Sequence, residues 1–219
     1  MTAFIIGAGA QGRVILDILR ASGEHDTIEF VDENAQLWGS RLNGALVGGS
    51  LDQALRGAGP LSAMIVALGN PRTRLAVGKL IEDRGGRLLN AIHPSAVVMP
   101  TVRLGKGNMI AAAAVVNTDS VIGNHTIVNT GAVIEHDCTI CDGAQVSPGA
   151  QIGGRVRLGQ SAFIATGAIV LSRLSVGPET VVAAGAVVTR DLPGHVLAMG
   201  VPARVHEQLP DDFDWKRVL

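Results

Sequence analysis

The sequence predicts two units in a row: a small α/β unit with a parallel sheet over residues 1–90, and an all-β prism of six-residue repeats over residues 91–219. Three observations predict this order. Strand and helix signals alternate up to about residue 90. From Ile92 onward, a branched apolar residue recurs at every sixth position. The 219 residues include 28 Gly, no Tyr, 4 Phe and 2 Trp, and a core almost without rings favours one small packing unit repeated many times.

The first unit begins with a strand, a glycine turn and a helix. The apolar residues 4–6 lead into the turn of residues 7–12, and apolar residues at helical spacing follow until Gly23. A second strand over residues 27–31 ends at Asp32. This order predicts two parallel strands joined by a helix that crosses one face of the sheet.

The remainder of the first unit repeats the alternation. A short helix covers residues 51–57, and the continuously apolar residues 63–68 predict a strand that is buried on both faces. Asn70 caps a helix that continues to about Asp83. A fourth strand over residues 87–92 would complete the small parallel sheet.

From residue 92 the period of the chain is six. Seventeen consecutive positions at this spacing carry Ile, Val or Leu, a run expected by chance about once in 10⁸. These positions are Ile92, Val98, Leu104, Ile110, Val116, Ile122, Val128, Ile134, Ile140, Val146, Ile152, Leu158, Ile164, Val170, Val176, Val182 and Val188. Six residues make a short strand and a corner, so three sides make a triangular coil of about 18 residues. The branched side chains then stack inward from coil to coil, and small residues such as Cys138 fit at the corners.

Charge and composition exclude several classes of protein. The 18 Lys and Arg against 19 Asp and Glu argue against a nucleic-acid partner. No apolar stretch approaches the roughly 18 residues of a membrane span, so we expect no membrane partner. No targeting segment is visible, so we expect a cytoplasmic protein. Cys138 and Cys141 form a single C-x-x-C, without the second pair or the thioredoxin-like helix start that a zinc or redox site needs. We expect no metal, and a G-x-S-x-G nucleophile motif is absent.

The six-residue repeats, the segment Gly200–Arg204 (GVPAR) and the glycine-rich first half together resemble a known group. They resemble bacterial sugar acyltransferases of the sialic-acid O-acetyltransferase type, above all the acetyl-CoA-dependent N-acetyltransferases that act on nucleotide-linked 4-amino sugars. The resemblance covers residues 3–204. It implies a left-handed β-helix and a homotrimer, with acetyl-CoA between neighbouring prisms and the sugar nucleotide on the N-terminal unit.

Acetyl transfer to an amine needs a general base, and histidine is the side chain best suited to that task near neutral pH. Of the six histidines, His136 follows the inward Ile134 by two residues, so its side chain should leave the prism, and Glu135 and Asp137 flank it. Spacing alone also permits a solvated surface histidine. The resemblance implies that His136 is the base, that Asp137 increases its basicity and that Asn129 lies near the same site. His125 is the second candidate.

The turn of residues 7–12 is a G-x-G-x-x-G between a strand and a helix, with Asp32 twenty residues beyond Gly12. Backbone N–H groups of such a turn hold phosphates, and the acid holds a ribose. A nicotinamide enzyme would need a second nucleotide-binding half, and a turn that only tightens the junction is a further alternative. The resemblance implies that a sugar nucleotide is held, with UDP, GDP and dTDP left open. Its implied contacts are Gly9, Ala10, Gln11, Asp32, Glu33, Gly69 and Arg72, although the family often has Ser-Gly-His where Gly9-Ala10-Gln11 stand.

The resemblance also implies contacts to acetyl-CoA at Gln145, Thr166 and Ala184, where Gln145 replaces a family histidine. Arg190 and Arg204 are candidates for the CoA phosphates, because guanidinium groups pair well with phosphate oxygens. The expected function is transfer of an acetyl group from acetyl-CoA to the 4-amino group of a UDP- or GDP-linked amino-deoxysugar by direct attack. The alternatives are O-acetylation of a sialic-acid-like sugar and a catalytically silent scaffold or nucleotide sensor.

Overall fold

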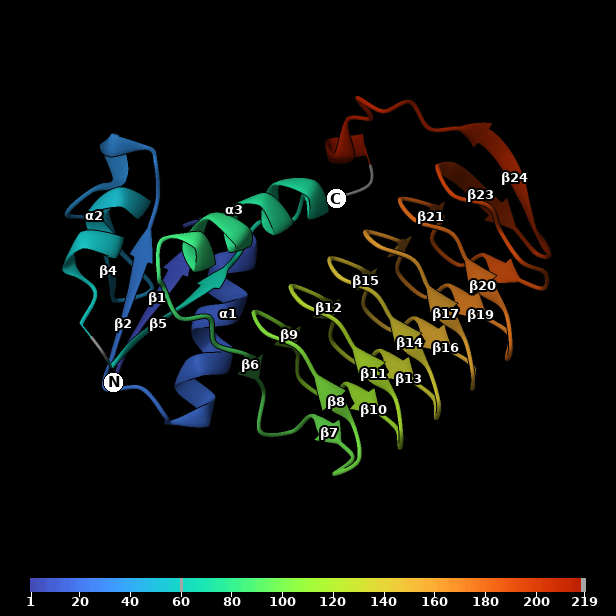
Figure 1. The fold of residues 1–219 in the computed structure, drawn as a ribbon, viewed down its shortest axis with the longest axis horizontal. Coiled ribbons are helices and arrows are strands. Elements are labelled where there is room, and N and C mark those ends of the chain that lie inside the picture. The colour runs from blue at the N-terminus through green and yellow to red at the C-terminus, as the bar shows by residue number, and fades with distance from the viewer. Residues whose placement is uncertain (60, 218–219) are drawn as a thin grey trace.

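A computed structural model describes residues 1–59 and 61–217 of the chain. An α/β unit occupies one end of the molecule, and a prism of short strands extends from it (Figure 1). The sheet of the α/β unit has the order β3-β4-β2-β1-β5. Its elements are β1 (Thr2–Ile6), α1 (Ala10–Ser22), β2 (Thr27–Val31), the 3₁₀ turn η1 (Ala35–Leu37), β3 (Arg41–Leu42), β4 (Ala45–Gly49), α2 (Leu51–Gly57), β5 (Ser62–Val66) and α3 (Pro71–Asp83).

The predicted strands and helices of the first unit are present, with two differences at its edges. β3 and β4 form a short antiparallel hairpin that the apolar pattern did not predict. Among the described residues, the segment predicted as a fourth strand, residues 87–92, pairs with the sheet through one isolated bridge, between Met64 and Leu88. Its end, β6 (Ala91–Ile92), pairs with β9 (Met109–Ile110) in the prism, because Ile92 already belongs to the six-residue period.

The prism has three faces, named here in chain order. Up to residue 188, the strands of one face pair in parallel at a spacing of 18 residues, for example Ile134 with Ile152, which confirms the predicted coil. The first face consists of β6, β9, β12 (Ile127–Val128), β15 (Gln145–Val146), β18 (Phe163–Ile164), β21 (Val181–Val182), β23 (Val196–Gly200) and the antiparallel β24 (Ala203–Gln208). A second 3₁₀ turn, η2 (Trp215–Arg217), follows near the C-terminus.

The other two faces contain only two-residue strands. The second face consists of β7 (Val97–Val98), β10 (Val115–Val116), β13 (Val133–Ile134), β16 (Gln151–Ile152), β19 (Ile169–Val170) and β22 (Val187–Val188). The third face consists of β8 (Arg103–Leu104), β11 (Val121–Ile122), β14 (Thr139–Ile140), β17 (Arg157–Leu158) and β20 (Ser175–Val176). Within the described residues, no helix is long and apolar enough to cross a membrane.

The branched residues of the six-residue period fill the interior. All of them from Ile110 onward are buried, whereas Ile92, Val98 and Leu104 are half-buried because no coil covers the first one. The small residues two positions earlier, such as Ala132 and Cys138, are also buried at the corners. The interior therefore packs as predicted, by contact between successive coils rather than by large side chains.

The first face is covered from outside at both ends. Next to the α/β unit, Met109 and Ile127 share a core with α1. Towards the far end, Phe163 and Val181 pack against a C-terminal cluster made by Leu209, Phe213 and Trp215. The aromatic rings of this cluster lie outside the prism, so the narrow interior stays free of rings as predicted.

Arg74 joins the two units from inside. Its side chain is 1% exposed, and its guanidinium donates to Leu68 O at 2.7 Å and Gly69 O at 2.8 Å after β5. It also donates to His125 O at 2.9 Å and Gly143 O at 2.8 Å in the prism. Burial lowers the pKa of the Arg74 guanidinium to about 9. One buried cation thus holds four carbonyl oxygens, two from each unit.

Replacing Arg74 with methionine should lower the free energy of unfolding by about 3–4 kcal/mol, because four buried carbonyl oxygens lose their donor. Urea unfolding followed by circular dichroism measures this change. The matched control is Lys79→Met on the same helix, whose ion pair with Asp83 is exposed and should contribute little. Equal, small losses in both variants would show that Arg74 does not hold the units together.

Candidate active site

His136 and Asp137 form a pair at the corner between β13 and β14. His136 Nδ1 lies 2.7 Å from Asp137 Oδ2, and both side chains are nearly half exposed, at 49% and 44%. The hydrogen bond to His136 holds the pKa of the Asp137 carboxyl below its usual range, and the nearby Arg155 cation lowers it further. Arg155 Nε lies 3.5 Å from the same Asp137 oxygen. Because the ionised Asp137 accepts a hydrogen bond from Nδ1–H of His136, it keeps the ring proton on Nδ1 and leaves Nε2 available as a base.

The backbone next to His136 has the geometry that this pair requires. Asp137 has a φ of 59°, in the left-handed region that turns the chain at the corner. One coil later, a Cβ on Gly154 would lie 2.7 Å from His136 Nε2, so the glycine leaves room for the ring. Sequence reasoning missed both Gly154 and Arg155. The double glycine 18 residues after the histidine was the available signal.

His125, the second candidate, is buried and packed between the units. A Cβ on Gly78 of α3 would lie 2.1 Å from its ring, and one on Gly107 would lie 2.5 Å away. Burial lowers the pKa of His125, and the Arg74 cation adds to this effect. With a 3% exposed side chain, His125 cannot meet a substrate without movement of α3. The geometry therefore favours His136 as the candidate base.

The lowered pKa of His125 predicts a pH-dependent stability. The unfolded chain takes up the proton near the ordinary pKa of 6.5, before the folded chain does, so the free energy of unfolding should fall as the pH drops below 6.5. Urea unfolding from pH 8 to pH 5 measures the slope. His125→Asn should flatten this slope, because asparagine tolerates the φ of 54° but does not titrate. An unchanged slope in this variant would assign the effect to other groups.

Asn129 and two of the predicted acetyl-CoA contacts lie at a different corner. Asn129 follows β12, at the corner between the first and second faces, and its Oδ1 accepts from Thr130 N at 2.8 Å. Thr166 and Ala184 are exposed at the same corner, one coil of 18 residues apart. His136 stands at the other end of β13. Within one chain, the second face therefore separates these residues from the candidate base.

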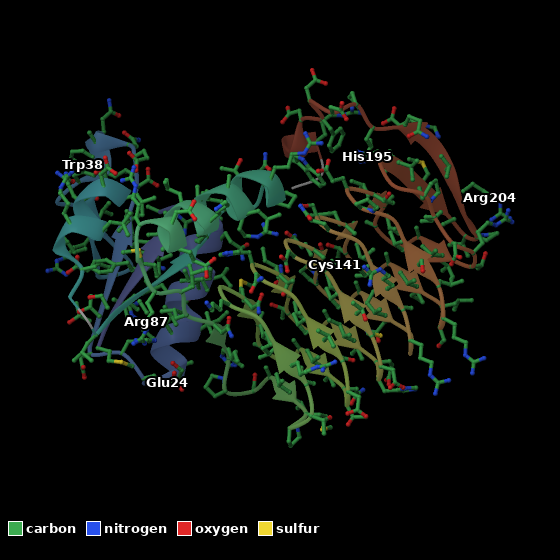
Figure 2. The ribbon with its side chains drawn as sticks, viewed as in Figure 1. Glu24, Trp38, Arg87, Cys141, His195 and Arg204 are labelled. Carbon is green, nitrogen blue, oxygen red and sulfur yellow. The ribbon has the colours of Figure 1, made fainter. Side chains whose placement is uncertain are left out.

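The other predicted CoA contacts are spread along the prism. Gln145 lies on the first face, where Nε2 donates to Ser147 Oγ at 3.4 Å and the buried Oε1 has no partner among the described residues. Arg190 is exposed beyond β22. Arg204 is exposed on β24 at the far end of the prism (Figure 2). No cluster of three or more His, Cys, Asp or Glu side chains that could hold a metal ion occurs in residues 1–59 and 61–217.

The glycine turn lies at the carboxyl ends of β1 and β2. Ala8 N donates to Asp32 Oδ2 at 2.9 Å, so the acid predicted to hold a ribose also fastens the turn. A Cβ on Gly12 would lie 2.2 Å from Gly7 O, which makes glycine necessary for the fold at that position. Gly9, the N-cap of α1, has open space around its Cα. Phosphate oxygens could therefore approach the start of α1 at Gly9.

Four more of the predicted sugar-nucleotide contacts lie at the start of α1, after β2 and after β5. Ala10 is exposed beside Gly9, and Gln11 reaches the prism, where Nε2 lies 2.7 Å from Met109 Sδ. Glu33 accepts from Leu51 N at the start of α2. Gly69 follows β5 at the same edge of the sheet, and its carbonyl oxygen is held by Arg74.

Arg72 is engaged by the prism and the C-terminal segment. Its guanidinium pairs with Glu179 and donates to Asp211 O, and the contact with Glu179 raises the pKa of Arg72. His195 Nδ1 lies 3.7 Å from the same Glu179 carboxylate. The structure thus brings the glycine turn, Asp32 and Gly69 to one sheet edge, while it uses the Arg72 side chain to bridge the two units.

Comparisons with known proteins place this arrangement in a family. Residues 2–80 match the family described as PglD N-terminal domain, and residues 119–154 match the bacterial transferase hexapeptide family. PerB of Caulobacter crescentus, solved with CoA and GDP-perosamine, is 42% identical, covers 94% of this chain and 98% of its own, and has a TM-score of 0.86. The chain belongs to the hexapeptide-repeat nucleotide-amino-sugar N-acetyltransferases.

Two further solved structures are similar to this chain over most of its length. The acetyltransferase domain of PglB from Neisseria gonorrhoeae, in complex with acetyl coenzyme A, is 34% identical over 94% of this chain and 98% of its own, with a TM-score of 0.89. WeeI of Acinetobacter baumannii is 26% identical over 94% and 100%, with a TM-score of 0.86. A search of curated proteins gave no match. The predicted family, the left-handed β-helix and the enzyme class, an acetyl-CoA-dependent sugar N-acetyltransferase, are confirmed.

Proposed function

We propose that this N-acetyltransferase moves the acetyl group of acetyl-CoA to the 4-amino group of a nucleotide-linked amino-deoxysugar, with His136 as general base. The observation that carries the proposal is the exposed His136–Asp137 pair, joined at 2.7 Å with Nε2 directed away from the carboxylate. PerB supports a GDP-linked sugar, because it was solved with CoA and GDP-perosamine. Variants of that protein with one histidine replaced by asparagine or alanine were solved with the same ligands.

The chemistry follows from the geometry of the pair. The amine nitrogen attacks the thioester carbonyl carbon, and His136 Nε2 takes the proton that the nitrogen loses. Asp137 holds Nδ1–H and stabilises the imidazolium that forms. The C–S bond then breaks, and the sulfur of CoA leaves with the proton that His136 returns. The products are the N-acetylated sugar nucleotide and free CoA.

The substrate would extend from the α/β unit towards the prism. The start of α1 at Gly9–Gln11 holds the diphosphate, and Asp32 with Glu33 lies beside the ribose. Gly69 and Arg72 mark the side of the sheet edge that faces the prism, since Arg74 holds the Gly69 carbonyl oxygen and Arg72 pairs with Glu179 of the prism. This proposal assigns sugar-nucleotide binding to residues 1–90 and acetyl transfer to residues 91–219, in a cytoplasmic enzyme.

The candidate base and two of the predicted acetyl-CoA contacts lie at different corners of one chain, and this separation supports a homotrimer. His136 and Asn129 stand at opposite ends of the second face, and Thr166 and Ala184 share the corner of Asn129. The outward side chains of this second face are mainly apolar, and Val97 and Ile169 are 47% and 37% exposed. Packing there against a neighbouring copy would bury this apolar surface and place the neighbour's acetyl-CoA contacts beside His136. Arg190 and Arg204 would then hold the CoA phosphates.

The test is an assay of thiol release from acetyl-CoA with GDP-, UDP- and dTDP-linked 4-amino sugars, each paired with the 4-hydroxyl analogue. The proposal expects acetylation of the amine and none of the hydroxyl. Acetylation of the hydroxyl alone would favour an O-acetyltransferase, and no transfer at all would favour a silent scaffold. Sedimentation at micromolar concentration tests assembly separately, and a monomer there would contradict the trimer.

A further inference from the structure

Trp38 is unusual among the few aromatic rings of the chain. Phe30, Phe163, Phe213 and Trp215 are buried, and Phe4 is half-buried, whereas Trp38 is 39% exposed. It follows η1 in the segment between β2 and β3, on the part of the α/β unit farthest from the prism in Figure 2. An exposed indole in a protein that otherwise hides its rings suggests a surface for a flat ligand.

The indole is held in place by its neighbours. Trp38 Nε1 donates to Asp32 O at 2.7 Å. The backbone on either side is also fastened, because Trp38 N donates to Ala35 O at 3.3 Å and Gly39 N donates to Val47 O of β4 at 2.9 Å. A ring fixed before its ligand arrives loses little conformational freedom on binding. Trp38 is therefore a preformed flat surface.

Asp32 links this surface to the glycine turn. Its backbone oxygen accepts from Trp38 Nε1, and its carboxylate accepts from Ala8 N inside the turn. If the diphosphate binds at the start of α1 and the ribose at Asp32, the nucleobase continues past Asp32, on the side away from Gly9. We propose that Trp38 stacks on the nucleobase of the sugar nucleotide, an inference that rests on the function proposed above. A purine overlaps the indole more fully than a pyrimidine, so guanine should bind more tightly than uracil.

The first experiment measures GDP binding by calorimetry. Trp38→Leu should raise the Kd for GDP between about 5-fold and 100-fold, the range that loss of base–aromatic stacking produces. Trp38→Phe should retain part of the affinity, because it keeps a ring but loses the hydrogen bond to Asp32 O. In the assay, Trp38→Leu should raise KM for the sugar nucleotide and leave KM for acetyl-CoA unchanged. The matched control is Leu61→Ala, which removes a 64% exposed apolar side chain before β5.

The second experiment uses Trp38 itself as the reporter. Trp215→Phe removes the other tryptophan, whose Nε1 has no partner among the described residues, and leaves Trp38 as the single fluorophore. GDP should quench its emission, whereas pyrophosphate, which offers no base, should not. Wild-type GDP affinity in Trp38→Leu, in an enzyme that still acetylates the sugar nucleotide, would overturn the stacking and leave the proposed function intact. Absence of both GDP binding and acetylation in the wild-type protein would overturn both.

Discussion

Replacing His136 with alanine should lower kcat by roughly 10²–10⁴-fold while both substrates still bind, the range typical of a lost general base. The reason is the geometry at the corner between β13 and β14. Only Nε2 of His136 is free to accept the proton, because Nδ1 is engaged by Asp137 at 2.7 Å. Steady-state kinetics with each substrate varied in turn separates this loss of kcat from a change in KM.

The neighbouring Asp137 makes the test specific. Asp137→Asn should cost less than His136→Ala, since it removes only the orientation and charge support of the ring. An active His136→Ala enzyme beside an inactive His125→Asn enzyme would identify His125 as the base.

Replacing Ile152 with aspartate should abolish the folded protein. Ile152 is 1% exposed and lies in register between Ile134 and Val170 in the interior of the prism. A carboxyl group at this position has no partner and must be buried, either charged or after taking up a proton, at a cost of more than about 4 kcal/mol. Soluble yield and thermal unfolding measure the outcome.

The preceding residue provides a matched control. Gln151 is on the same strand, but its side chain is exposed on the second face. Gln151→Asp should therefore leave the fold of each chain intact, and sedimentation of this variant separates any effect on the proposed contact between copies, which uses the same face. A folded Ile152→Asp protein beside an unfolded Gln151→Asp protein would mean that the assigned register is wrong by one residue, since neighbouring residues in a strand point to opposite sides.

The prism could be predicted because each of its coils packs on the next through the same kind of contact. Each coil packs on the next through the same position, so a period of six in the sequence is sufficient to place Ile134, Ile152 and Val170 in one column. The α/β unit was predictable for a related reason, because its strands and helices carry local signals such as the Asn70 cap of α3. The β3–β4 hairpin lacked such a signal, since β3 has only two residues and β4 ends in two glycines.

The candidate site was only partly predictable. The flanking acids singled out His136, and the strand–turn–helix pattern placed Asp32 beside the glycine turn. The sequence could not show that Gly154 makes room for the imidazole, because this contact joins residues in two coils. Nor could it show that Trp38 is fastened to Asp32, since that bond depends on how the segment after β2 folds back.

The sequence by itself determined the two units, the inward column, the family and the candidate base. Tertiary structure alone decided which charged side chains are used within the fold. Arg74 is one of several arginines on α3 and its surroundings, yet it is the one buried against four carbonyl oxygens, and Arg72 is paired with Glu179 of the prism. Periodic patterns report contacts that recur at fixed spacing. A contact between α3 and the prism occurs once, and its partners are chosen by how the two units meet in space.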